Sequence, residues 1–172
     1  MKKILTLLFF AILTSCSSPQ KHTYTQKTAT QILEKDSEIM DYAILSAAPS
    51  GKKVLETSKN MIDDQSIVIG GCWHYINAVY NYSGFDGKKR KTIFKSKFKG
   101  PYAETSLIEA GDWLYFVNHT FNDIEHSAIF IAWIDQDKKE ALMVNYVGGN
   151  RKTPGTFKRF ILDSVYNIIR AE

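Results

Sequence analysis

The stretch His126-Ser-Ala-Ile-Phe-Ile-Ala-Trp-Ile-Asp-Gln-Asp-Lys-Lys-Glu-Ala-Leu-Met-Val-Asn-Tyr146 decides the fold class of this chain. It contains two short runs, 127–134 and 141–146, in which aromatic and β-branched residues are frequent, as is typical of strands. The residues between them, 135–138, have the polar composition of a hairpin turn. The stretch therefore predicts two neighbouring antiparallel strands.

Two further segments of the second half have strand character. Residues 112–117 form another short aromatic and aliphatic run. Residues 157–170 are ambiguous between a terminal strand and a helix, and the β-branched residues within 165–169 favour a strand. We therefore expect a small antiparallel sheet in this half of the chain.

The first half of the chain has helical periodicity instead. Within residues 28–48, apolar side chains recur at intervals of three and four, which predicts an amphipathic helix ended by Pro49-Ser50-Gly51. Residues 52–61 are compatible with a second short helix, and 72–82 with a third that begins after Gly70-Gly71. Helices followed by strands predict a single α+β domain over residues 28–172. The expected apolar face of the first helix comprises Ile32, Leu33, Ile39, Met40, Ala43, Ile44 and Ala47.

The N-terminus has the layout of an export signal. Lys2 and Lys3 precede an apolar run of residues 4–13, and residues 1–15 are predicted to be removed. That run is too short for a transmembrane helix, which needs about 20 apolar residues. The residues Leu13-Thr14-Ser15-Cys16 resemble the lipobox of bacterial lipoproteins, which implies a lipid anchor on Cys16. The alternative is an ordinary secretory signal with a coincidental cysteine.

The polar residues 16–27 are expected to form a flexible tether between the lipid and the domain. The expected location is therefore the cell envelope, with the protein bound to a membrane through its lipid. Ser17 would fit the periplasmic side of the outer membrane if the source is Gram-negative.

Composition excludes several classes of function. The formal net charge is only +4, and no groove-reading motif occurs, so no nucleic-acid partner is expected. The basic cluster within 88–99 is interpreted as a solvated loop or hairpin, or else as a contact for anionic lipid or cell-wall polymer. Neither a phosphate-binding glycine loop nor a metal-binding spacing of the four histidines is present, so we expect no cofactor and no metal. Those histidines are His22, His74, His119 and His126.

Cys72 is the candidate nucleophile. If Cys16 carries lipid, Cys72 is an unpaired thiol in an exported protein, and it is either buried or reactive. A helix N-terminus or a neighbouring imidazolium lowers the pKa of a thiol, and the predicted helix start after Gly70-Gly71 supplies the first of these conditions. The plainer interpretation is a buried, inert thiol.

His126 and Asn145 are the candidate partners of this thiol. His126 opens one predicted strand, so it can face a helix terminus as a general base. Asn145 on the next strand could orient the imidazole, as an asparagine does in papain-like sites. Structural roles remain open for both residues, and His74 or His119 could replace His126. Asp112 is interpreted as structural.

The order of these motifs resembles the papain-like cysteine hydrolases of the NlpC and CHAP type. The resemblance is carried by Gly71-Cys72-Trp73-His74-Tyr75, by Gly111-Asp112-Trp113-Leu114-Tyr115-Phe116, by His126-Ser127-Ala128-Ile129-Phe130, and by Val144-Asn145-Tyr146. It implies a papain-like α+β fold and thiol-dependent cleavage of an amide, commonly in peptidoglycan peptides. It assigns Cys72 as nucleophile, His126 as base and then acid, and Asn145 as the orienting residue. This chain has Gly71-Cys72-Trp73 where many relatives have Asp-Cys-Ser, and the third position is often His or Glu in them.

Two other functions stay open on the sequence. One is a binding lipoprotein that has the same fold without catalysis. The other is a thioesterase or acyltransferase on lipid-linked substrates, because the same pair of residues can attack an ester. The sequence carries no indication of oligomeric state.

Overall fold

The computed structural model describes residues 21–149 and 152–172. The expected signal, Cys16 and the first part of the expected tether lie outside the described residues. The helices are α1 (Lys21–Ser46), α2 (Pro49–Asp63) and α3 (Cys72–Tyr82), and two 3-10 turns span Gly87–Lys89 and Thr105–Leu107. The strands are β1 (Arg90–Lys95), β2 (Trp113–Asn118), β3 (Ile124–Asp135), β4 (Glu140–Asn145), β5 (Thr156–Ile161) and β6 (Val165–Ala171). The α+β class predicted from the sequence is confirmed.

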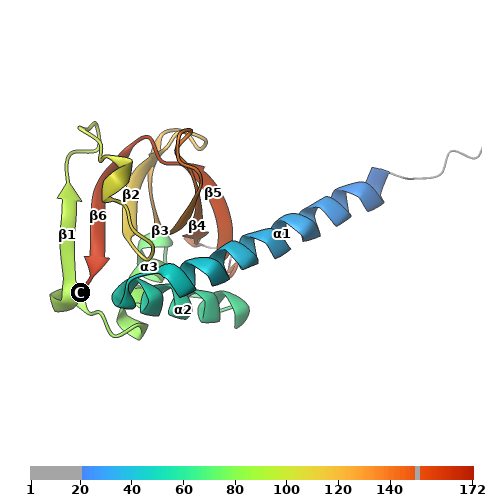
Figure 1. Ribbon diagram of the computed structural model, residues 1–172, viewed down its shortest axis with the longest axis horizontal. Coiled ribbons are helices and arrows are strands. Elements are labelled where there is room, and N and C mark those ends of the chain that lie inside the picture. Colours follow the sequence, from blue (N-terminus) through green and yellow to red (C-terminus); the bar gives the residue numbers. More distant parts are fainter. Residues whose placement is uncertain (1–20, 150–151) are drawn as a thin grey trace, which may run out of the picture.

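The six strands form one sheet in the order β1-β6-β2-β3-β4-β5, and every neighbouring pair is antiparallel. The predicted β3–β4 hairpin is present, with Ile129 opposite Val144. Helices α2 and α3 pack on one face of the sheet, and α1 crosses them and projects away from the domain (Figure 1).

The sheet is strongly curved. Phe116 on β2 and Phe160 on β5 are separated in the sheet by β3 and β4, so in a flat sheet they would be about 14 Å apart at 4.7–4.9 Å per strand. Their ring centroids are 5.1 Å apart instead. The sheet therefore curls until side chains from distant strands meet on its concave face, and these side chains form a second core that the helices do not cover.

The main core lies between the helices and the convex face. Alternate residues of β3 and β4 point toward the helices, as the period of two along a strand requires. Side chains such as Leu55, Ile76 and Ile129 are fully buried there. This packing fixes the start of α3 relative to the sheet.

Helix α1 differs from the prediction at both ends. It begins at Lys21, inside the segment expected to be a flexible tether, and no glycine or proline interrupts residues 21–46. It ends at Ser46, and Pro49 begins α2 rather than ending α1, because a proline without an N–H group suits the first turn of a helix. Ile32 and Leu33 are exposed, contrary to expectation, because this part of α1 extends past the sheet.

The terminal segment contains two strands where a single one was favoured. A strand over residues 157–170 would be ~46 Å long at 3.3 Å per residue, which exceeds the other strands. The chain instead turns at 162–164, so that β5 forms one edge of the sheet and β6 an inner strand. The basic cluster also contains an unpredicted strand, β1, which pairs with β6.

Within residues 21–149 and 152–172, no helix is both long enough and apolar enough to cross a membrane.

Candidate active site

Cys72 is the first residue of α3, as predicted. Gly71 is the N-cap residue, and its N–H donates to Nδ1 of His74 at 3.2 Å. His74 therefore caps the helix and does not replace His126. Gly70 has a φ of +123°, a conformation that favours glycine, and a Cβ there would lie 2.4 Å from the ring of His74. The Gly-Gly pair thus permits the sharp entry into α3 that places the thiol at the helix start.

His126 and Asn145 are hydrogen-bonded to each other. Nε2 of His126 donates to Oδ1 of Asn145 at 2.8 Å. The His126 ring also lies against Phe116 and Phe160, with centroid distances of 5.6 and 5.4 Å, at the end of the concave core. These contacts fix the orientation of the ring and leave Nδ1 as its second polar atom.

The thiol of Cys72 interacts with His126. Burial raises the pKa of this thiol, but hydrogen bonding to the His126 side chain and to Ser127 outweighs burial, and together they lower the pKa to about 7. Ser127 is buried directly after His126 on β3, and it contributes to the lowered pKa of the thiol. The structure thus brings together the three residues that the sequence selected, Cys72, His126 and Asn145.

One short segment, residues 145–149, holds both halves of this arrangement. Asn145 binds His126, while the Tyr146 hydroxyl accepts from the Val68 N–H at 3.1 Å and donates to its carbonyl at 2.6 Å. The Gly149 N–H donates to the carbonyl of Gly70 at 2.8 Å. The end of β4 therefore positions the imidazole and, at the same time, the loop that leads into Cys72.

Gly148 is required by this close approach. Its φ is +67°, and a Cβ at this position would lie 2.4 Å from the Gly70 carbonyl oxygen and 2.6 Å from Cα of Gly71. Such distances are far below any normal contact. The second Gly-Gly pair of the chain thus packs directly on the first.

Aromatic residues form one wall beside the thiol. Tyr115 stacks on the buried Trp113, with ring centroids 5.5 Å apart. The exposed Trp73 packs against Trp113, with ring centroids 5.9 Å apart. Burial raises the pKa of Tyr115 to about 12, and the negative charges of Glu125 and Cys72 act in the same direction. The hydroxyl of Tyr166 donates to Glu125. The phenols thus remain protonated hydrogen-bond donors near the sulfur.

An open cleft borders His126 and Asn145, and Cys72 is not among the residues that line it. Its volume is about 480 Å³, and apolar and polar residues both line it. The lining residues are Asn118, Thr120, Phe121, Ile124, His126, Asn145, Val147, Gly148, Gly149 and Lys158. The cleft therefore gives a ligand direct access to the His126–Asn145 pair.

Asp112 and His119 make structural contacts away from the thiol. Asp112 is buried, receives two hydrogen bonds of 2.8 Å from Arg170, and accepts from the Glu109 N–H, in agreement with its predicted structural role. His119 lies 2.6 Å from Asp123 and is exposed. Trp133 packs against Phe130. No group of three or more metal-binding side chains occurs within residues 21–149 and 152–172.

Sequence reasoning missed several residues at the site. Ser127 directly follows His126, and Gly148-Gly149 follows Asn145 closely. Their positions next to the predicted site residues were a sequence signal that could have identified them. Lys158 gave no such signal, because only the curvature of the sheet brings β5 beside His126.

Comparisons with known proteins by family model, by sequence against curated proteins and by solved structure gave no match to this chain.

Proposed function

We propose that this protein is a lipid-anchored cysteine amidase or peptidase of papain-like fold that cleaves amide bonds in the cell envelope, with peptidoglycan peptides as the expected substrates. The observation that carries the proposal is the contact of a thiol at a helix N-terminus with an imidazole whose other nitrogen is bound by Asn145. Each of these features activates a cysteine nucleophile.

The first chemical step follows from this geometry. Nδ1 of His126 accepts the thiol proton of Cys72, and the sulfur attacks the amide carbonyl carbon. The resulting oxyanion lies near the first N–H groups of α3, which have no acceptor within the helix. One such donor typically contributes a rate effect of about 10²–10³.

The second step completes the turnover. The tetrahedral intermediate collapses, the C–N bond breaks, and His126 returns its proton to the leaving amine. A water molecule then loses a proton to His126 and hydrolyses the thioester, which releases the acid and regenerates the thiol. Asn145 keeps the same ring orientation in both steps by accepting from Nε2.

The proposed location follows from the sequence alone. A diacylglycerol on Cys16 would hold the protein at a membrane, since each buried lipid methylene contributes about 0.8 kcal/mol. The polar residues that follow Cys16 and the long helix α1 would separate the domain from the lipid surface.

The test uses purified peptidoglycan and measures newly released amino groups. We expect the wild-type protein to release them and Cys72→Ala to release none while remaining folded. His126→Ala should be similarly inactive. His119→Ala is the matched control, because His119 is exposed and pairs with Asp123 outside the site, and it should retain activity. Full activity of Cys72→Ala would refute the proposal and would favour a function that does not use the thiol.

A further inference from the structure

The basic cluster within residues 88–99 has two parts, which strand β1 separates. At the start of β1, Lys89 donates to the Gly84 carbonyl at 3.1 Å, and Lys91 lies 3.1 Å from a carboxylate oxygen of Glu172. These two cations therefore have partners within the fold. The second part begins at the last residue of β1, about 17 Å along the strand from its first residue at 3.3 Å per residue.

The second part consists of Lys95, Lys97 and Lys99, which are all exposed. Within residues 31–149 and 152–172, no carboxylate oxygen lies within 4.0 Å of their ammonium groups, in contrast to Lys91 and Lys138. An open surface hollow of about 500 Å³ borders two of them, and none of the described residues that line it is acidic. These charges are therefore available to an anionic partner. The lining residues are Phe94, Lys95, Ser96, Lys97, Gly100 and Pro101, and we refer to residues 95–101 as the basic loop.

An exposed aromatic residue, Phe98, stands between two of these lysines. Its ring packs edge-on against Tyr166, with ring centroids 5.7 Å apart. The Tyr102 hydroxyl donates to the Phe98 carbonyl at 3.3 Å, and the Gly100 N–H donates to the Lys97 carbonyl at 2.8 Å. These contacts hold the basic loop in a folded shape that keeps part of the Phe98 ring in contact with solvent.

Exposed lysines around an exposed aromatic ring suit the surface of an anionic phospholipid bilayer. Each lysine near such a surface strengthens binding about fivefold through attraction to the headgroups. An aromatic side chain can bury its ring at the boundary between headgroups and acyl chains. A soluble polyanion would attract the same charges but would leave the phenyl ring in water.

The basic loop lies at the end of the sheet that also carries the candidate site. Tyr166, which Phe98 contacts, donates through its hydroxyl to Glu125 on β3. Glu125 directly precedes His126. A surface that contacts the basic loop would therefore lie near the imidazole.

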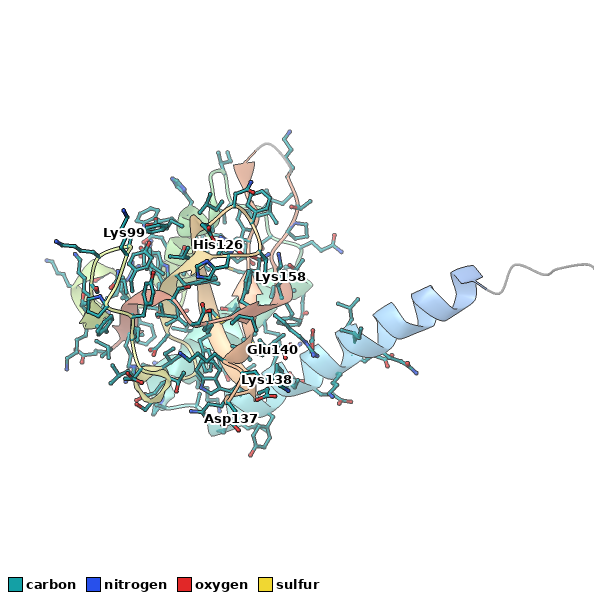
Figure 2. All side chains as sticks on the ribbon, turned by 90° about the horizontal axis from the view of Figure 1, so that it is seen from above. Lys99, His126, Asp137, Lys138, Glu140 and Lys158 are labelled. Atoms are coloured by element: carbon teal, nitrogen blue, oxygen red, sulfur yellow. The ribbon has the colours of Figure 1, made fainter. Side chains whose placement is uncertain are left out.

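The orientation of α1 is compatible with such a contact. Figure 1 shows the basic loop above the end of β1, and α1 rises toward the same side of the molecule as it approaches its N-terminus. Figure 2, which looks down on that side, shows Lys99 and His126 in one half of the view and Lys138 at the opposite edge. The five residues from Cys16 to Lys21 can span at most about 18 Å. A lipid on Cys16 and the basic loop can thus reach the same bilayer.

We propose that the basic loop docks on anionic phospholipid headgroups, with its three lysines at the phosphates and the Phe98 ring at the boundary of the acyl chains. This contact rests on the membrane location in the proposed function but does not use the thiol. It supplies a second membrane signal beside the lipid on Cys16, and it holds the domain with its site close to the bilayer.

The experiment measures how a lipid surface protects individual lysines from acetylation. The full-length protein is mixed with an excess of vesicles, made either of phosphatidylcholine alone or of equal parts of phosphatidylcholine and phosphatidylglycerol. A neutral acetylating reagent is added, and mass spectrometry gives the acetylation rate of each lysine. The ratio of the rates on the two kinds of vesicle reports contact with anionic lipid, whether or not Cys16 also anchors the protein.

We expect Lys97 and Lys99 to be acetylated about five- to tenfold more slowly on the anionic vesicles than on the neutral ones. This protection should disappear at 1 M salt, where the Debye length is about 3 Å. Lys138 is the internal control, because it pairs with Asp135 far from the basic loop, and it should react at the same rate on both kinds of vesicle.

Two substitutions separate the ring from the charges and from the thiol. Phe98→Ser should lose most of the protection, whereas Tyr82→Ser, which removes an exposed aromatic ring at the end of α3, should retain it. Cys72→Ala should be protected like the wild type, because docking does not involve the sulfur.

Three results would overturn the proposal. Equal acetylation rates on the two kinds of vesicle would exclude the contact. Unchanged protection in Phe98→Ser would mean that charge alone explains it, so that any polyanion would serve. Equal protection by inorganic phosphate at the same phosphate concentration would assign the hollow to a free phosphate group. Each result is distinct from failure of the proposed function, which is measured by the amino groups released from peptidoglycan.

Discussion

Nε2 of His126 lies 2.8 Å from Oδ1 of Asn145, across the β3–β4 pair. This contact uses one ring nitrogen for orientation and leaves the other for the Cys72 thiol. Because the residues after Asn145 also hold the Gly70-Gly71 loop, a single strand end controls both sides of the candidate site.

Asn145→Ala should reduce amide cleavage strongly without unfolding the protein. Removing the acceptor frees the His126 ring, and we expect a loss on the order of 100-fold in kcat. The cost in stability should be only about 1 kcal/mol, because one hydrogen bond is lost. Asn145→Asp retains an acceptor oxygen and should restore part of the rate. Equal losses in both variants would contradict an orienting role.

Gly148→Ala should be much more damaging than Gly149→Ala. The two glycines have nearly equal φ angles, +67° and +69°. Backbone strain should therefore destabilise the folded state to a similar extent when alanine stands at either position. A Cβ at Gly148 would also collide with Gly70 and Gly71, whereas nothing lies within 4 Å of one at Gly149. Urea unfolding should show an additional loss of about 1–3 kcal/mol for Gly148→Ala. We also expect slower alkylation of Cys72 in that variant. Identical behaviour of the two variants would show that the close approach is unimportant.

Asp112→Asn should destabilise the fold but leave the chemistry of the thiol intact. Asp112 is buried and accepts two hydrogen bonds from Arg170, so the substitution should cost about 2–3 kcal/mol. Asp135→Asn is the control, because Asp135 forms an exposed pair with Lys138, and its urea midpoint should not change. At urea concentrations below the unfolding transition, Cys72 should be alkylated at the wild-type rate in both variants. A specific loss of thiol reactivity in Asp112→Asn would assign Asp112 to the site.

The sequence was sufficient for the fold class because its two halves have different periodicities. The β3–β4 hairpin and the start of α3 are marked by local signals, namely alternation, a polar turn and a Gly-Gly pair. The division between β5 and β6 and the pairing of β1 depend on which strands meet in space. No local pattern contains that information, so these elements were missed or merged.

The same distinction applies to the site. Cys72 begins α3 and Asn145 ends β4, as the local signals predict. His126 was expected to open its strand, but β3 begins two residues earlier, at Ile124. The antiparallel hairpin brings His126 and Asn145 together. Lys158 and Phe160 approach His126 only because the sheet curls upon itself. Curvature results from the whole sheet, and a short motif does not predict it.

The most direct test of the central claim is the pH dependence of Cys72 alkylation by iodoacetamide in the wild type and in His126→Gln. Only the thiolate reacts, so with a pKa of about 7 the wild-type rate should rise as the pH increases through 7 and level off above it. Removing His126 should move this inflection upward, toward the ordinary thiol value of 9.0, because burial then acts against fewer stabilising contacts. A wild-type inflection already near 9, unchanged by the substitution, would contradict the claim that His126 ionises this cysteine.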